Sequence, residues 1–268
     1  MRFLEALIAI EASDDPQRPV LRLIGPPQVT AFGERIEIPE SCKRLLAFIA
    51  TRGSGVDRRL AASCLWPNGN NQRAGGNLRT ALWRLNGIPL PLVVTPNQAL
   101  YLSPKVVVDF HVVSTWATRL TTSRAEPRDL DVDAPDIEAM ELFPGWYDDW
   151  AVLERERFRY RMLHAAETLS RLLGQRGLTG VALATAISVV SADPLRESAQ
   201  QVLIEAHLRA GNLVEARRCY DAYRELLRQE LDVEPGAELT SLVSQSYSFD
   251  VPRPRPGNSI AVQDGRRT

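Results

Sequence analysis

Asn77-Leu-Arg-Thr-Ala-Leu-Trp-Arg-Leu85 is the stretch that decides the fold. Its apolar residues recur at i, i+3, i+4 and i+7, which predicts a helix with one buried face: Leu78, Ala81, Leu82 and Leu85. The opposite face carries hydrogen-bonding and cationic side chains: Asn77, Arg79, Thr80, Trp83 and Arg84. Such side chains can contact base edges or phosphates. A cationic helix face is more often only solvated, so the neighbouring sequence has to decide between the two interpretations.

The neighbouring elements favour a winged helix. Upstream, Asp57 can cap a short helix that Trp66-Pro67 ends, with an apolar stripe of Leu60, Ala61, Cys64 and Leu65. Downstream, Asn86-Gly87 suits a helix end with a left-handed residue. Two strand-like runs follow, residues 92–95 and 99–103, around the turn 96–98. Helix, turn, basic helix and hairpin is the order of a winged helix, whose second helix enters the major groove.

A small β-sheet is predicted ahead of these helices. Residues 20–25, 29–32 and 35–38 read as three short antiparallel strands. A helix over residues 41–52 then directs four apolar side chains inward: Leu45, Leu46, Phe48 and Ile49. The expected fold class of the first half is therefore α+β, a winged helix with a leading β-sheet.

Charge is divided unevenly along the 268 residues. The formal net charge is −1, but residues 20–108 have a net charge of +7 and residues 109–268 a net charge of −6. A basic module joined to an acidic one is what DNA binding by the first half alone predicts. Further candidates for contact with phosphate in the basic half are Arg44, Arg58, Arg59, Arg73 and Lys105.

Nothing in the sequence indicates an enzyme. The three histidines, His111, His164 and His207, are far apart and have no neighbouring nucleophile. The three cysteines lack the spacing of metal ligands, so we expect no metal and no cofactor. No segment approaches the length of a membrane helix, and we expect a cytoplasmic, nucleoid-associated protein with no membrane partner. Met1 to Ile10 is interrupted by Glu5, which predicts a frayed amphipathic extension.

The second half is predicted to be helical after an irregular start. A helix over residues 110–120 leads into residues 121–141, which are rich in Asp, Pro and Glu and predict a mobile acidic loop. Next comes the aromatic run Leu142-Phe-Pro-Gly-Trp-Tyr-Asp-Asp-Trp150, typical of a packing corner. Beyond it, four residues recur after a period of 34: Leu169 with Leu203, Gly177 with Gly211, Ala182 with Ala216, and Ala186 with Tyr220. This period is that of tetratricopeptide-like helix pairs.

These patterns divide the chain into four parts. We expect an N-terminal extension at residues 1–19 and a winged-helix DNA-binding domain at 20–108. An all-α tetratricopeptide-like domain is expected at 109–248. The Pro-rich residues 249–268 are expected to form a disordered tail.

The layout resembles the Streptomyces antibiotic regulatory protein family. Four passages carry this resemblance: Leu21-Arg-Leu-Ile-Gly25, Arg59-Leu-Ala-Ala-Ser-Cys-Leu-Trp-Pro67, residues 77–85, and residues 144–150 together with Asp193-Pro-Leu-Arg-Glu-Ser198. The resemblance implies an OmpR-like winged helix followed by a bacterial transcriptional activation domain. It further implies an activator that binds tandem repeats in promoter DNA, as a possible homodimer, and recruits RNA polymerase through its sigma factor or another subunit.

The sequence departs from the family at two places. Gly75-Gly76 lies where the family has helix formers, which predicts that the basic helix starts late or is soft. The hairpin tip, Pro96-Asn-Gln98, lacks the family's basic side chain. The alternative function is a tetratricopeptide-type interaction scaffold with only non-specific affinity for DNA.

Overall fold

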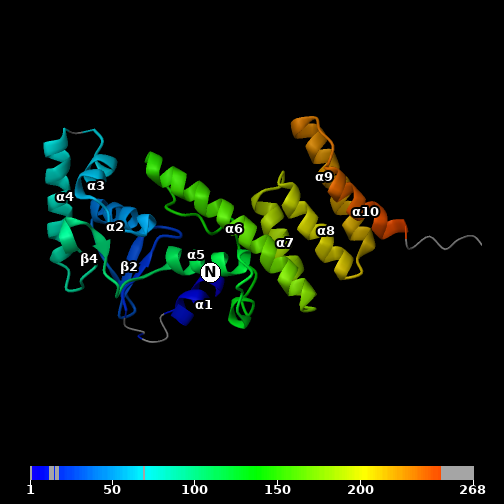
Figure 1. The fold of residues 1–268 in the computed structure, drawn as a ribbon, viewed down its shortest axis with the longest axis horizontal. Coiled ribbons are helices and arrows are strands. Elements are labelled where there is room, and N and C mark those ends of the chain that lie inside the picture. Colours follow the sequence, from blue (N-terminus) through cyan, green and yellow to red (C-terminus); the bar gives the residue numbers. More distant parts are fainter. Residues whose placement is uncertain (1, 12–14, 16–17, 69, 249–268) are drawn as a thin grey trace, which may run out of the picture.

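The computed structural model describes residues 2–11, 15, 18–68 and 70–248. The molecule is elongated, with the helices α3 and α4 at one end and a stack of helices at the other (Figure 1). The expected tail, residues 249–268, lies outside the described residues. Among the helices that are described, none has the length and apolarity needed to cross a membrane.

The leading sheet is present and gains a fourth strand. Strands β1 (Val20–Arg22), β2 (Gln28–Ala31) and β3 (Glu34–Ile36) are antiparallel, as predicted. The added strand, β6 (Val107–Val108), pairs in parallel with β1, so the sheet order is β3-β2-β1-β6. This pairing was not predicted, and it returns the chain to the sheet after the winged helix is complete.

The winged helix follows the predicted order. Helix α2 (Glu40–Arg52) buries the predicted apolar side chains, and α3 (Arg58–Leu65) packs against α4 (Asn71–Asn86). The wing consists of β4 (Val93–Val94) and β5 (Tyr101–Leu102), joined by a 3-10 turn at Pro96–Gln98. The Asp57 carboxylate caps α3, as predicted, by accepting from the backbone N–H groups of Arg59 and Leu60. This cap defines the N-terminal end of α3.

Helix α4 differs from expectation at both of its ends. It begins at Asn71, ahead of the two glycines, so the prediction of a late start was wrong. The Asn70 side chain accepts a 2.8 Å hydrogen bond from the backbone N–H of Arg73, and this cap stabilises the first turn despite the glycines. At the other end, Gly87 has a φ of −75° and is not left-handed. In α3, Leu60 is 47% exposed and does not belong to the buried stripe.

Residues 2–11 form a packed helix, α1 (Arg2–Glu11), and the prediction of a frayed extension was wrong. Phe3 is buried, with its ring 4.9 Å from that of Trp116 in an edge-to-face contact. Glu5, which interrupts the apolar run, forms an ion pair with Arg22 at 2.6 Å. The carboxylate is thus satisfied at the surface while the apolar face of the helix is buried.

The acidic segment 121–141 is anchored at several points, so the prediction of a mobile loop was wrong. Asp129 is 1% exposed, and its carboxylate accepts hydrogen bonds of 2.6 and 2.9 Å from Arg119. The indole N–H of Trp116 donates to the Asp129 carbonyl at 3.0 Å. Leu130 and Met140 are buried in the same core. These contacts fix the segment against α5 (Asp109–Thr121).

A buried junction connects the two halves of the chain. Asp109, the first residue of α5, accepts hydrogen bonds from the backbone N–H groups of Leu23 and Ile24 at 2.8 to 3.0 Å, and burial raises its pKa to about 7. The backbone N–H of Phe143 donates to the Leu23 carbonyl at 3.1 Å. The predicted aromatic corner is a packing corner, since three of its rings are buried: Phe143, Trp146 and Trp150. One apolar cluster extends from α1 to α8, and the expected boundary between residues 108 and 109 stays a prediction.

The second half is all-helical and repeats a helix pair. The pairs are α6 (Asp149–Gln175) with α7 (Thr179–Ala192), and α8 (Glu197–Arg209) with α9 (Leu213–Leu231), followed by α10 (Ala237–Ser248). Gly177 and Gly211 have φ values of +78° and +75°, which only glycine adopts without strain. Ala182 and Ala216 are buried where the paired helices meet. The predicted period of 34 residues is thus the period of this helix pair.

Candidate nucleic-acid interface

Helix α4 exposes the face that the sequence singled out. Its buried side faces α2 and α3, because Ala74, Leu78 and Ala81 belong to the apolar core. The side chains of the opposite face are all exposed: Asn77, Arg79, Thr80, Trp83 and Arg84. Trp83 is 75% exposed, which is unusual for an indole. The thiol of Cys42 on α2 lies 3.6 Å from the Ala81 carbonyl, and burial raises the pKa of this thiol, as fits a packing residue.

The segment that forms α3, α4 and the wing has no negative side chains. The sequence from Arg58 to Val108 contains no Asp or Glu. It contains six cations: Arg58, Arg59, Arg73, Arg79, Arg84 and Lys105. The ion pairs of the neighbouring segments involve other cations, such as Arg35 and Lys43. Within the described part of the chain these six cations form no ion pair, so their charge is available to a partner.

The wing is joined to the start of α3. Val56 and Leu100 exchange backbone hydrogen bonds of 2.8 and 2.9 Å. Since Val56 directly precedes Asp57, the cap of α3, these bonds attach the wing to the start of that helix. The Nε of Arg58 donates to the Gln98 carbonyl at 3.2 Å. At the wing tip, Asn97 and Gln98 both have positive φ, 51° and 63°. The tip and the N-terminal end of α3 are therefore neighbours, and Arg58 lies between them.

Two of the predicted contact residues lie apart from α4. Arg44 forms an ion pair with Asp148, and its guanidinium lies over the ring of Trp146 at 5.0 Å from the centroid. Since these partners belong to the junction between the halves, Arg44 is engaged within the molecule. Lys105 lies in the turn between β5 and β6, at the end of the wing that is remote from its tip. Arg73, by contrast, is exposed in the first turn of α4.

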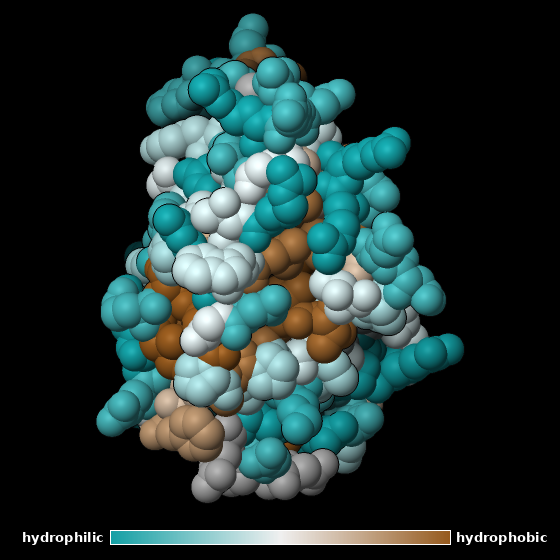
Figure 2. Space-filling model, turned by 90° about the vertical axis from the view of Figure 1, so that its left-hand side faces the viewer, coloured by the Kyte–Doolittle hydropathy of each residue, from teal (hydrophilic) through white to brown (hydrophobic). Residues whose placement is uncertain are grey.

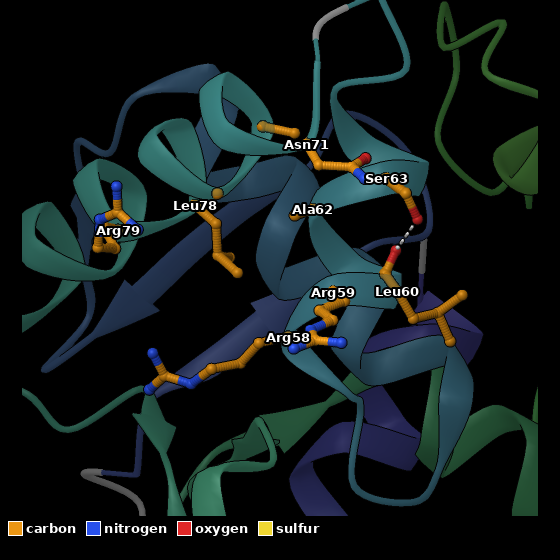
Figure 3. Close-up of a pocket in the computed structure, with 10 residues that line it drawn as sticks. Arg58, Arg59, Leu60, Ala62, Ser63, Asn71, Leu78 and Arg79 are labelled. Carbon is orange, nitrogen blue, oxygen red and sulfur yellow. Dashed lines mark hydrogen bonds between the residues drawn. The ribbon is translucent and has the colours of Figure 1, made fainter.

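A hollow between α3 and α4 was not predicted from the sequence. The end of the molecule that carries these helices shows a strip of apolar atoms bordered by hydrophilic side chains (Figure 2). The hollow has a volume of about 720 Å³. Figure 3 shows Leu78 pointing towards it from α4, with Arg58 and Arg59 on α3 and Arg79 on α4 around it. The exposed Leu60 contributes to its lining, and the sequence pattern gave no signal of this, since it placed Leu60 in the buried stripe.

Fold and surface together define a class of protein: a winged helix with a basic exposed face, joined to a helical-repeat module. Residues 137–245 match the family model described as bacterial transcriptional activator domain. The regulatory protein AfsR of Streptomyces griseus is 32% identical over 126 residues, which cover 47% of this chain and 13% of that protein. The chain thus spans a small part of this relative.

A solved structure shares the fold. Mycobacterium tuberculosis EmbR, in complex with a low affinity phosphopeptide, superposes with a TM-score of 0.61 at 19% identity, covering 87% of this chain and 65% of that one. At this identity the likeness is evidence of fold alone. The comparisons therefore assign a bacterial transcriptional activator domain to residues 137–245 and a fold shared with EmbR to most of the chain.

Proposed function

We propose that this chain is a transcriptional activator that binds tandem repeats in promoter DNA through α4 and recruits RNA polymerase through its helical module. The observation that carries the proposal is the exposed face of α4. It presents Arg79, Arg84 and Asn77, and the segment from residue 58 to residue 108 contains no carboxylate. Arginine and asparagine are the side chains that pair with guanine and adenine edges in the major groove.

The contacts divide into two roles. Asn77, Arg79, Thr80, Trp83 and Arg84 are proposed to face the bases, because they lie on the outward side of α4. Arg58, Arg59 and Arg73 are proposed to hold phosphates, because they lie at the N-terminal ends of α3 and α4. Phosphate contacts set affinity and its dependence on salt, whereas base contacts set sequence preference. We exclude Arg44 from the proposed surface because it is paired with Asp148.

Selection from a random duplex library tests base recognition without knowledge of the operator. The full chain should enrich a repeated motif, and Arg79→Ala should weaken binding to it by about 1–3 kcal/mol. A double change of Arg58 and Arg59 to alanine should weaken binding to selected and scrambled duplexes alike and flatten the salt slope by about two units. Arg218→Ala is the matched control, since Arg218 is an exposed arginine of α9 on the helical module.

The alternative, an interaction scaffold with non-specific DNA affinity, predicts a different result. It predicts no enriched motif and the same affinity for every duplex. Transcription by purified RNA polymerase holoenzyme, from a template that carries the enriched motif, tests the second part of the proposal. Stimulation by the full chain is expected. A protein that binds its motif but leaves transcription unchanged would contradict recruitment while retaining DNA recognition.

A further inference from the structure

The hollow between α3 and α4 has an apolar floor that DNA phosphates do not need. Its floor and walls include Ala62 and Ala74, which are almost fully buried, and the side chain of Leu78. Leu60 borders it and is 47% exposed. A phosphate is wholly hydrophilic and gains nothing from contact with such a surface. An apolar group that covers the surface removes both from water, which is favourable. The floor therefore suits a ligand that has an apolar body.

The rim of the same hollow is cationic. Arg58 and Arg59 come from α3 and Arg79 from α4, so guanidinium groups flank the opening from both helices (Figure 3). The Nε of Arg58 is used by the Gln98 carbonyl, which leaves its terminal nitrogens free to donate elsewhere. The remaining polar groups of the lining are the neutral side chains of Ser63 and Asn71. Guanidinium groups bind carboxylate, sulfonate and phosphate in a bidentate manner.

We propose that this hollow binds a small anion with an apolar body, such as an aromatic or alkyl carboxylate, sulfonate or phosphate monoester. Its volume of about 720 Å³ is in the range of small-molecule sites. The apolar body occupies the space beside Leu60 and Leu78, and the anionic group meets the arginines of the rim. Charge complementarity selects this class, because the segment that forms the hollow supplies cations and no carboxylate.

Ligand and DNA should exclude each other. This second part rests on the proposed function, in which Arg58, Arg59 and Arg79 also contact DNA. A ligand seated among these side chains neutralises them and fills the space that the duplex backbone approaches. Reciprocity requires that DNA weaken the ligand by the same factor by which the ligand weakens DNA. The hollow would then be a site at which a metabolite-like anion releases the protein from DNA.

The fluorescent anion 8-anilinonaphthalene-1-sulfonate is a suitable probe, since it joins an aromatic body to a sulfonate. Titration of the full chain should show saturable binding of one probe molecule. Arg59→Ala should weaken it about tenfold, as expected for loss of a hydrogen bond to a charged group. Leu60→Gln should weaken it severalfold, and this exposed position tolerates a polar side chain. The uncharged analogue N-phenyl-1-naphthylamine should bind more weakly than the sulfonate.

The controls separate this site from general stickiness and from the proposed function. Arg218→Ala should leave probe affinity unchanged, and near-ultraviolet circular dichroism should show that all variants keep the native fold. Probe binding that is absent, or that is indifferent to both Arg59→Ala and Leu60→Gln, would overturn the site. Selected DNA should displace the probe from the wild-type chain. If DNA binds and the probe stays, mutual exclusion is wrong. If no duplex binds specifically, the proposed function fails while the variants still decide the site.

Discussion

Replacing Arg44 by alanine should lower the free energy of unfolding and leave DNA affinity unchanged. Arg44 extends from α2 to Asp148, the residue before α6, and its guanidinium lies over the buried ring of Trp146. From the sequence it was a candidate for phosphate contact. The structure makes it a bridge between the winged helix and the helical module, and the two roles predict opposite measurements.

The magnitude follows from the exposure of the partners. The side chains of Arg44 and Asp148 are 31% and 22% exposed, so solvent screens their attraction and about 0.5–1 kcal/mol is a fair value for the pair. The contact with Trp146, at 5.0 Å from the ring centroid, adds about 0.5–1 kcal/mol. We therefore expect Arg44→Ala to cost about 1–2 kcal/mol, and Asp148→Ala about 0.5–1 kcal/mol.

Urea denaturation of both single variants and the double variant provides the measurement. The double-mutant cycle should yield a coupling energy of about 0.5–1 kcal/mol, because the ion pair is lost only once. In parallel, the salt slope of DNA binding should be the same for Arg44→Ala and the wild type. A coupling energy near zero, with a salt slope reduced by about one unit, would refute the bridge and restore Arg44 as a phosphate contact.

Further predictions concern stability. Gly75→Ala should stabilise the chain by about 1 kcal/mol, since an added Cβ meets nothing closer than 3.8 Å. Gly211→Ala should destabilise it by about 1–2 kcal/mol, because Gly211 has a φ of +75°. Thermal unfolding of the two variants compares these effects. Ala216→Leu should lower the melting temperature, since overpacking this fully buried position costs about 1–3 kcal/mol, and should abolish activation; a variant that keeps both would argue against close packing there. Burial raises the pKa of Asp129, but hydrogen bonds, chiefly from Arg119, outweigh it and hold the pKa below the ordinary 3.8. This stabilisation is present above about pH 4 and is lost as the pH falls through the lowered pKa, so Asp129→Asn should flatten the acid limb of the stability curve, and an unchanged limb would exclude the pair as its cause.

Local sequence patterns predicted the elements of this fold well where burial is one-sided. The period of Leu78, Ala81, Leu82 and Leu85 defined the buried face of α4 because a helix presents its residues every 3.6 positions. The left-handed glycines, Gly177 and Gly211, marked the turns of the repeat because few other residues adopt a positive φ. Both signals are local, and neither depends on what the element packs against.

Predictions failed where a distant partner changes the meaning of a charge. Glu5 looked like a break in an apolar run, but Arg22 pairs with it at the surface and the helix around it is buried. Asp129 contributed to an acidic composition that predicted a mobile loop, but this side chain is buried and paired with Arg119. Composition counts each carboxylate as a solvated group. Composition carries no information on whether a cation elsewhere in the chain will pair with that carboxylate.

Only part of the candidate site was predictable, because sequence patterns describe one helix at a time. The exposed face of α4 follows from its own sequence, whereas the hollow beside it exists only because α3 lies across from α4. Leu60 was assigned to the buried stripe of α3 because it is apolar, and the structure leaves it 47% exposed at the edge of this hollow. A single-helix pattern cannot distinguish an apolar residue of the core from one that lines a groove.

The junction determines which experiments can separate the two modules. The aromatic corner contacts the winged helix directly, with the Trp150 ring 5.2 Å from that of Phe48 and the Phe143 N–H bonded to the Leu23 carbonyl. A fragment that ends near residue 109 would expose this apolar surface, so loss of DNA binding by the fragment would not distinguish misfolding from a missing contact. A point change at Arg79 avoids this ambiguity, because its side chain is exposed on α4 and lies far from the junction along the chain. The same packing restricts the helical module to one position relative to α4. If α4 is seated in the major groove, the position of the motif along the duplex then determines on which side of the DNA the helical module meets the polymerase. Insertion of half a helical turn between the motif and the promoter should therefore abolish stimulation. The same insertion should leave affinity for the motif unchanged.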